Sequence, residues 1–121
     1  VSCKIKNLSD FEILLWFGSE INLTLYSPYP FLFAEIEKRS FYLDKNFEID
    51  NVSFLNVIDK KRKKSISFRT STPVTLWHFP VFHISSSERG LEKTYQGSSV
   101  TFLSKFKLRK NDLKEIHFEV E

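Results

Sequence analysis

The residues in this sequence with the types most often found at metal or nucleophilic sites are three histidines and one cysteine, His78, His83, His117 and Cys3. A zinc site needs three or four converging ligands. Pro80 separates His78 from His83, so the spacing does not show whether their side chains point the same way. Neither a helix end nor a positioned base lies beside Cys3 to activate its thiol. We expect no metal site and no cofactor, and Cys3 as a small core residue.

Motifs of known enzyme active sites are absent from the sequence. It contains no Gly-rich phosphate loop, no GxSxG, no HExxH and no CxxC. Carboxylates are plentiful, but no pair is marked as buried, so a general acid–base pair has no support. We expect no catalytic residues, no small-molecule substrate and a chain that is not an enzyme.

A basic run is the clearest positive feature, with five adjacent Lys and Arg residues at 60–64. Such a run can contact phosphates, serve as a nuclear import signal, or form a solvated turn between strands. A second basic group lies at 105–110, on outward strand positions and the following turn. If both groups share a face, binding to nucleic acid or acidic phospholipid is favoured. The candidate residues are Lys60, Lys61, Arg62, Lys63, Lys64, Lys105, Lys107, Arg109 and Lys110.

Aromatic residues are the second positive feature, because the chain has 13 Phe, 4 Tyr and 2 Trp. Three stretches, LLWFG, YSPYPFLF and TLWHFPVFH, hold more apolar residues than one inward-facing strand side needs. They fit either a sheet buried on both faces or an exposed patch that receives a partner. The candidate protein-interaction residues are Trp16, Tyr26, Tyr29 and Trp77.

The elements that position these residues are predicted to be strands, because the dominant hydrophobic period is two and turn signals recur every 8–12 residues. We expect an all-β, mainly antiparallel sandwich or flattened barrel of about nine to eleven short strands. Pro80 predicts a strand that breaks and crosses between sheets, and 88–95 predicts a loop or one helical turn. The expected strands lie near 1–6, 11–17, 20–26, 31–37, 40–44, 47–58, 64–69, 74–79, 81–85, 99–108 and 114–121.

Length and composition indicate one β domain over residues 1–121, which we expect to be excised from a larger protein because the chain begins inside an alternating apolar pattern. A single cysteine favours a reducing, intracellular compartment. Three Asn-x-Ser/Thr sequences leave open a secreted glycoprotein.

Together these features predict a non-catalytic protein-interaction or oligomerisation module of a larger intracellular, nuclear protein, with a protein partner or self-association. The alternative is a basic β module that binds nucleic acid or acidic phospholipid through the two basic groups.

Overall fold

The computed structural model describes all residues, 1–121, and consists of strands joined by turns and loops, without a helix. The expected all-β, mainly antiparallel architecture is confirmed, with eight strands in place of nine to eleven. The strands are β1 (Ser2–Lys6), β2 (Ile13–Thr24), β3 (Leu32–Ile36), β4 (Arg39–Tyr42), β5 (Phe47–Asp59), β6 (Lys64–Ser87), β7 (Gly90–Leu108) and β8 (Leu113–Val120). The chain thus has no helix that is long and apolar enough to span a membrane.

The strand number is lower than expected because several short expected strands are continuous. The strands expected at 11–17 and 20–26 form the single β2, and those expected at 64–69, 74–79 and 81–85 form the 24-residue β6. Pro80 does not interrupt β6, where it pairs with Ser98 of β7. Pairing between β5 and β6 ends at His78, so a missing amide hydrogen at Pro80 breaks no bond on that side.

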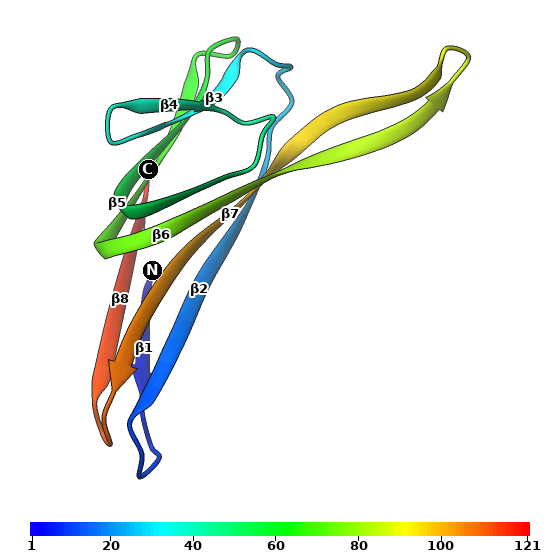
Figure 1. Ribbon diagram of the computed structural model, residues 1–121. Coiled ribbons are helices and arrows are strands. Elements are labelled where there is room, and N and C mark those ends of the chain that lie inside the picture. The colour runs from blue at the N-terminus through cyan, green and yellow to red at the C-terminus, as the bar shows by residue number, and fades with distance from the viewer.

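The sheet bends on itself because β6 changes neighbours along its length. Its first part, around Phe68–Thr70, pairs with β8, and its second part, from Thr75 on, pairs with β7. The register with β5 shifts twice between these parts, near Val52. Such bulges bend a strand. The order β1-β8-β6-β5-β3-β4 and the branch β6-β7-β2 therefore lie in one folded sheet (Figure 1).

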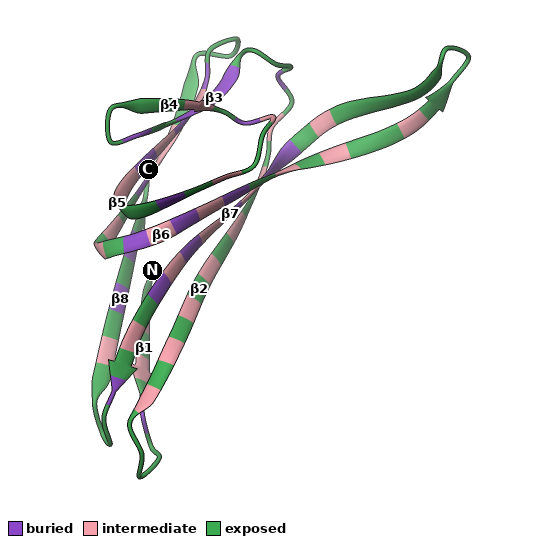
Figure 2. Ribbon diagram, in the orientation of Figure 1, coloured by how far each residue is buried: buried purple, intermediate pink, exposed green.

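The core lies between the two parts of this folded sheet. Buried residues concentrate on β3, β5, the middle of β6 and the middle of β7 (Figure 2). Strands β2 and β7 place alternate residues inward, which is why the period-two pattern predicted them. The cluster comprises Leu32, Ala34, Ile36, Leu43, Ile49, Val52, Leu55, Val57, Phe68, Val74, Leu76, Val100, Phe102, Ile116 and Phe118.

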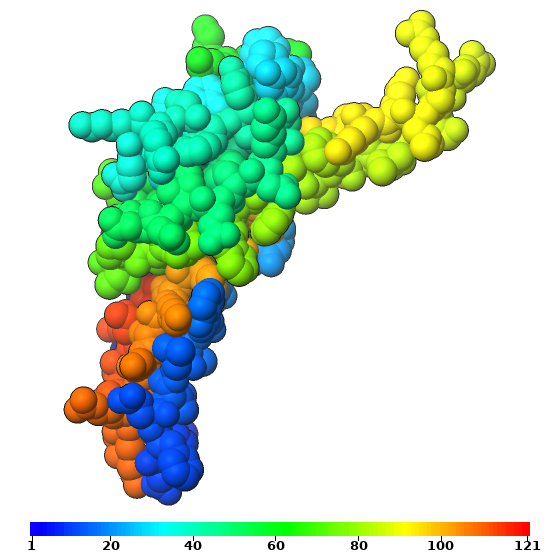
Figure 3. Space-filling view, in the orientation of Figure 1, coloured from blue at the N-terminus to red at the C-terminus, as the bar shows by residue number.

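A long hairpin leaves this body, and it replaces the loop expected at 88–95. Residues 82–87 of β6 pair with 90–95 of β7 and with no other strand. The hairpin projects well beyond the rest of the molecule in the ribbon and space-filling views (Figures 1 and 3). We call residues 82–95 the arm.

Candidate functional site

The basic run forms the turn between β5 and β6, and a buried carboxylate fixes that turn. The carboxylate of Asp59 accepts a 2.6 Å hydrogen bond from Ser27 Oγ and a 3.0 Å bond from the backbone N–H of Arg62. Burial by itself would raise the pKa of Asp59, but these bonds and the Arg62 charge hold the pKa below its usual value. Asp59 is the only Asp or Glu residue that is buried as a whole, although one carboxylate oxygen of the half-buried Asp44 is also buried and has no partner. Its interactions are those of a turn anchor.

Three side chains of the basic run lie over aromatic rings. The cationic groups of Lys60, Lys61 and Arg62 are 4.6, 5.9 and 5.4 Å from the ring centroids of Phe33, Phe31 and Tyr26, respectively. At these distances a cation is attracted to the ring face. The run and the segment 25–31 are thus parts of one surface, a proximity that the sequence did not show because some thirty residues separate them.

The second basic group lies at the other end of the molecule. The β5–β6 turn is at the upper end in Figure 1, whereas the C-terminal end of β7 is at the lower end. Lys110 pairs with Asp10, and Arg109 Nε lies 3.6 Å from a carboxylate oxygen of Glu12. The two basic groups therefore do not form one continuous anion-binding face.

The four candidate aromatic residues are also separated, although three of them are well exposed. Trp16, Tyr26 and Tyr29 are 55%, 72% and 58% exposed. Trp16 lies on β2 beneath the ammonium of Lys105, at 5.0 Å, while the two tyrosines lie in the β2–β3 connection. Trp77 is half-buried on β6, and its indole N–H has no partner. The structure does not bring the four together as one patch.

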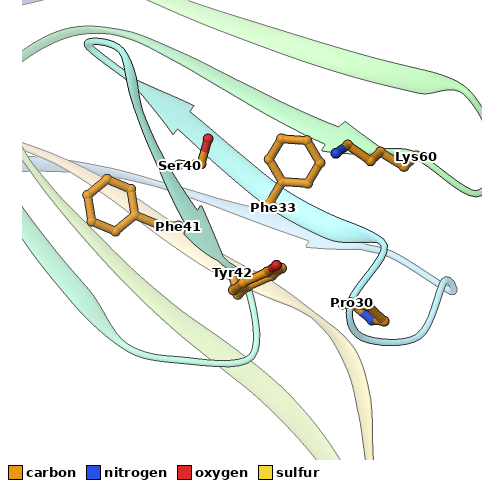
Figure 4. Close-up of a pocket in the computed structure, with 6 residues that line it drawn as sticks. All are labelled: Pro30, Phe33, Ser40, Phe41, Tyr42 and Lys60. Carbon is orange, nitrogen blue, oxygen red and sulfur yellow. The ribbon is translucent and has the colours of Figure 1, made fainter.

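A small pocket of about 150 Å³ opens beside the segment 25–31 (Figure 4). Tyr42 lies at its edge and meets Tyr29 edge-to-face with centroids 5.1 Å apart. The ammonium of Lys60 points toward the ring of Phe33, so that ring face is already occupied (Figure 4). The lining residues are Pro30, Phe33, Ser40, Phe41, Tyr42 and Lys60.

The histidines lie apart from one another, and the chain has no cluster of three His, Cys, Asp or Glu side chains suited to a metal. His78 is buried, with Nε2 2.6 Å from Ser98 Oγ and Nδ1 2.9 Å from the Lys45 carbonyl. His117 is exposed on β8, and Cys3 is half-buried on β1.

The arm is the feature that sequence reasoning missed. Its outer part carries exposed apolar residues, with Ile84 64% and Leu91 81% exposed. Phe82 packs edge-to-face with Tyr95 near its base, where Lys93 lies 3.9 Å from the Phe82 centroid. Alternating Phe82 and Ile84 followed by a Gly-containing turn was the available signal.

A groove of about 550 Å³ lies at the base of the arm, and we call it the arm-base groove. It forms where β2 ends at Thr24 and β7 continues into the arm with β6 as its single partner strand. Val81 pairs with Gly97 and Phe82 with Tyr95, so Gln96 is an extra residue of β7 and forms a bulge. The Gln96 carbonyl accepts a 3.0 Å hydrogen bond from Leu25 N–H. The groove is lined by Asn22, Leu23, Thr24, Tyr26, Val81, Thr94, Tyr95, Gln96 and Gly97.

Comparison with known proteins gives this fold a context. Residues 1–118 match the family model described as alpha-amylase/4-alpha-glucanotransferase, C-terminal. The chain is 32% identical over 111 residues to alpha-amylase 1 of Dictyoglomus thermophilum, covering 87% of this chain and 15% of that protein. The crystal structure of 4-alpha-glucanotransferase from Thermococcus litoralis superposes with a TM-score of 0.59 and 22% identity, over 98% of this chain and 16% of that one. The chain thus spans about a sixth of each relative.

These matches overturn the function expected from the sequence. A nuclear, non-enzymatic interaction or oligomerisation module, and its alternative, a basic module for nucleic acid or phospholipid, are both wrong, because the matched family and relatives are carbohydrate-active enzymes. The family match extends over residues 1–118 and is not confined to one short segment. With its family model matched from residue 1 to residue 118, the chain belongs to the alpha-amylase/4-alpha-glucanotransferase C-terminal family.

Proposed function

We propose that this chain is the C-terminal β domain of a longer enzyme that acts on 4-α-linked glucans. The observation that carries the proposal is the family match over nearly the whole chain, combined with the small share of each relative that the chain spans. Its single-domain character, its origin in a larger protein and its intracellular location remain part of the proposal.

The carboxylates of this domain support a non-chemical role within that enzyme. Cleavage of a glycosidic bond uses two carboxyl groups that flank the bond, about 5 to 9.5 Å apart. The one Asp or Glu residue that is buried as a whole, Asp59, is engaged by Ser27 and Arg62. We therefore place the reacting carboxylates in the rest of the enzyme, and the work of this domain in binding and packing.

The arm supports a packing contact with the rest of the same enzyme chain. A two-stranded hairpin is at best marginally stable in water without a third strand or another layer over it. Beyond its base the arm has neither, and it exposes Ile84 and Leu91. An enzyme six or seven times longer than this chain, as its relatives are, offers a surface to cover those side chains. Packing of the arm on that surface would fix the position of the domain.

The test uses the full-length enzyme and compares two charged variants. Ile84→Asp with Leu91→Asp places charges on the arm, and Leu8→Asp, at a residue 79% exposed in the β1–β2 loop, is the matched control. We expect full-length enzyme to transfer or hydrolyse maltoheptaose, and to resist tryptic cleavage after Arg89 at the arm tip. The arm variant should lose that protection, and the control should keep it.

Two results would contradict the proposal. An absence of any activity on maltoheptaose would contradict the proposal that the full-length protein is a glucan enzyme. Equal cleavage after Arg89 in the parent, the arm variant and the control would contradict the proposed contact of the arm. If light scattering shows that protection arises only in a dimer, the arm packs on a second copy and the intrachain contact is wrong.

A further inference from the structure

We infer that the arm-base groove binds an α-linked glucan chain, as a site separate from the one where the bond is cleaved. The inference rests on the proposed function, since it takes the ligand class from the enzyme in which the domain would work. It adds a binding site within this domain and names the residues that form it.

The polar groups that line the groove are neutral. Asn22 and Gln96 contribute amides, and Thr24 and Thr94 contribute hydroxyls, while no charged side chain lines the groove. Amides and hydroxyls both donate and accept hydrogen bonds, as sugar hydroxyls do. A ligand rich in phosphate would instead require Lys or Arg. The lining therefore matches a neutral, hydroxyl-rich ligand.

Tyr26 supplies the apolar surface on which one face of a sugar ring can lie. It is 72% exposed, and it also lines a second groove of about 340 Å³ that contains Arg62. The Arg62 guanidinium lies over the ring at 5.4 Å from its centroid. Tyr26 thus borders both grooves, and its exposed ring can offer apolar surface to a ligand in the arm-base groove.

The backbone on both sides of Tyr26 is held in place, so the ring is presented without a large ordering cost. Leu25 N–H donates to the Gln96 carbonyl at 3.0 Å, which ties the two walls of the groove together. Ser27 is buried and donates to Asp59 at 2.6 Å. A site whose groups are already positioned loses less entropy when it binds.

Size and position also favour this groove over the pocket of Figure 4. Its volume of about 550 Å³ lies within the range of ~300–1,000 Å³ typical of ligand sites. The pocket beside Lys60 has about 150 Å³, and Lys60 covers its Phe33 ring. The arm-base groove lies where the arm leaves the body, next to the proposed contact with the rest of the enzyme, and ligand sites often lie at domain boundaries.

The experiment measures how tightly the full-length enzyme binds glucans. Calorimetry measures binding of maltoheptaose while an inhibitor occupies the active site, and native gels that contain amylopectin measure retardation of the enzyme. The variants are Tyr26→Ala and Gln96→Ala. Tyr29→Ala is the matched control, because Tyr29 is 58% exposed and lies outside the groove. We expect Tyr26→Ala to weaken binding roughly tenfold, as when a main aromatic contact is removed, and Gln96→Ala to weaken it less. The control should bind like the parent enzyme.

The outcomes separate this inference from the proposed function. An enzyme that acts on maltoheptaose but is retarded equally in the Tyr26→Ala and parent forms overturns the groove and leaves the proposed function standing. An enzyme with no activity and no retardation overturns both. Equal losses in Tyr26→Ala and Tyr29→Ala would also overturn it, because the effect would then not belong to this groove.

Discussion

Nε2 of His78 lies 2.6 Å from Oγ of Ser98, and both residues are almost fully buried. Nδ1 of His78 faces the Lys45 carbonyl at 2.9 Å, and a carbonyl can only accept, so the ring proton lies on Nδ1. Ser98 must then donate to Nε2, and Tyr95 donates to Ser98 at 2.7 Å. The chain of bonds runs in one direction and joins β7, β6 and the β4–β5 loop. Burial, partly offset by the bond with Ser98, raises the pKa of Tyr95 to about 12.

The first prediction is that acid weakens the fold through His78. Burial lowers the pKa of His78 below 6.5, and the bond to the Lys45 carbonyl offsets this only in part. The unfolded chain therefore takes up a proton near pH 6.5 that the folded chain does not, so stability is full above that pH and falls below it. Urea unfolding between pH 5 and 8 measures the effect. His78→Gln should show a smaller loss between pH 6.5 and 5, and an equal loss would show that another group is responsible.

The second prediction concerns the buried turn anchor. Ser27→Ala leaves the Asp59 carboxylate without its 2.6 Å donor and should destabilise the domain by about 1–3 kcal/mol at pH 7, the usual effect of an unpaired buried group. Because the pKa of Asp59 is lowered on folding, its contribution is present above pH 3.8 and disappears as the pH falls further. Chemical denaturation of Ser27→Ala and of Ser86→Ala, an exposed control, provides the comparison.

The strand pattern of the sequence predicted much of the fold, because alternation along β2 and β8 reflects one inward and one outward face. It did not predict the length of β6. The expected strands stopped at 69 and at 79, yet β6 continues through Pro73 and Pro80. The register shifts near Val52 accommodate Pro73, and the absence of a β5 partner beyond His78 accommodates Pro80. These compensations depend on pairing between distant residues, which no local pattern records.

The candidate sites were less predictable than the strands. The basic turn at 60–64 was expected to be exposed, and it is. Its contacts with the rings of Tyr26, Phe31 and Phe33 depend on β3 pairing with β5, a relationship that period and composition do not encode. The arm-base groove depends on where β2 ends relative to β7, so its residues had no shared signal in the sequence.

The third prediction tests the core at Leu76, which is fully buried in the middle of β6. Leu76→Ala removes buried methyl groups and leaves a cavity, so the free energy of unfolding should fall by about 2–5 kcal/mol. Ile84→Ala in the arm removes a similar number of atoms from a side chain that is 64% exposed, and should change the free energy of unfolding of the domain much less. Thermal and urea unfolding of the two variants would show the difference, and similar losses would contradict the placement of the core.

The fourth prediction concerns Gly97, which lets β2 and β7 come close where the arm begins. A Cβ added at Gly97 would overlap the backbone carbonyl of Leu23, and neither strand can move without loss of their pairing. Gly97→Ala should therefore destabilise the domain by about 1–3 kcal/mol, the usual effect of overpacking. Gly18→Ala is the control on the same pair of strands, because its Cβ would lie 3.2 Å from the Thr101 side chain, which can shift. Urea unfolding should give a clearly lower free energy of unfolding for Gly97→Ala than for Gly18→Ala. The reverse order would show that the strands do not meet as closely at Gly97 as described.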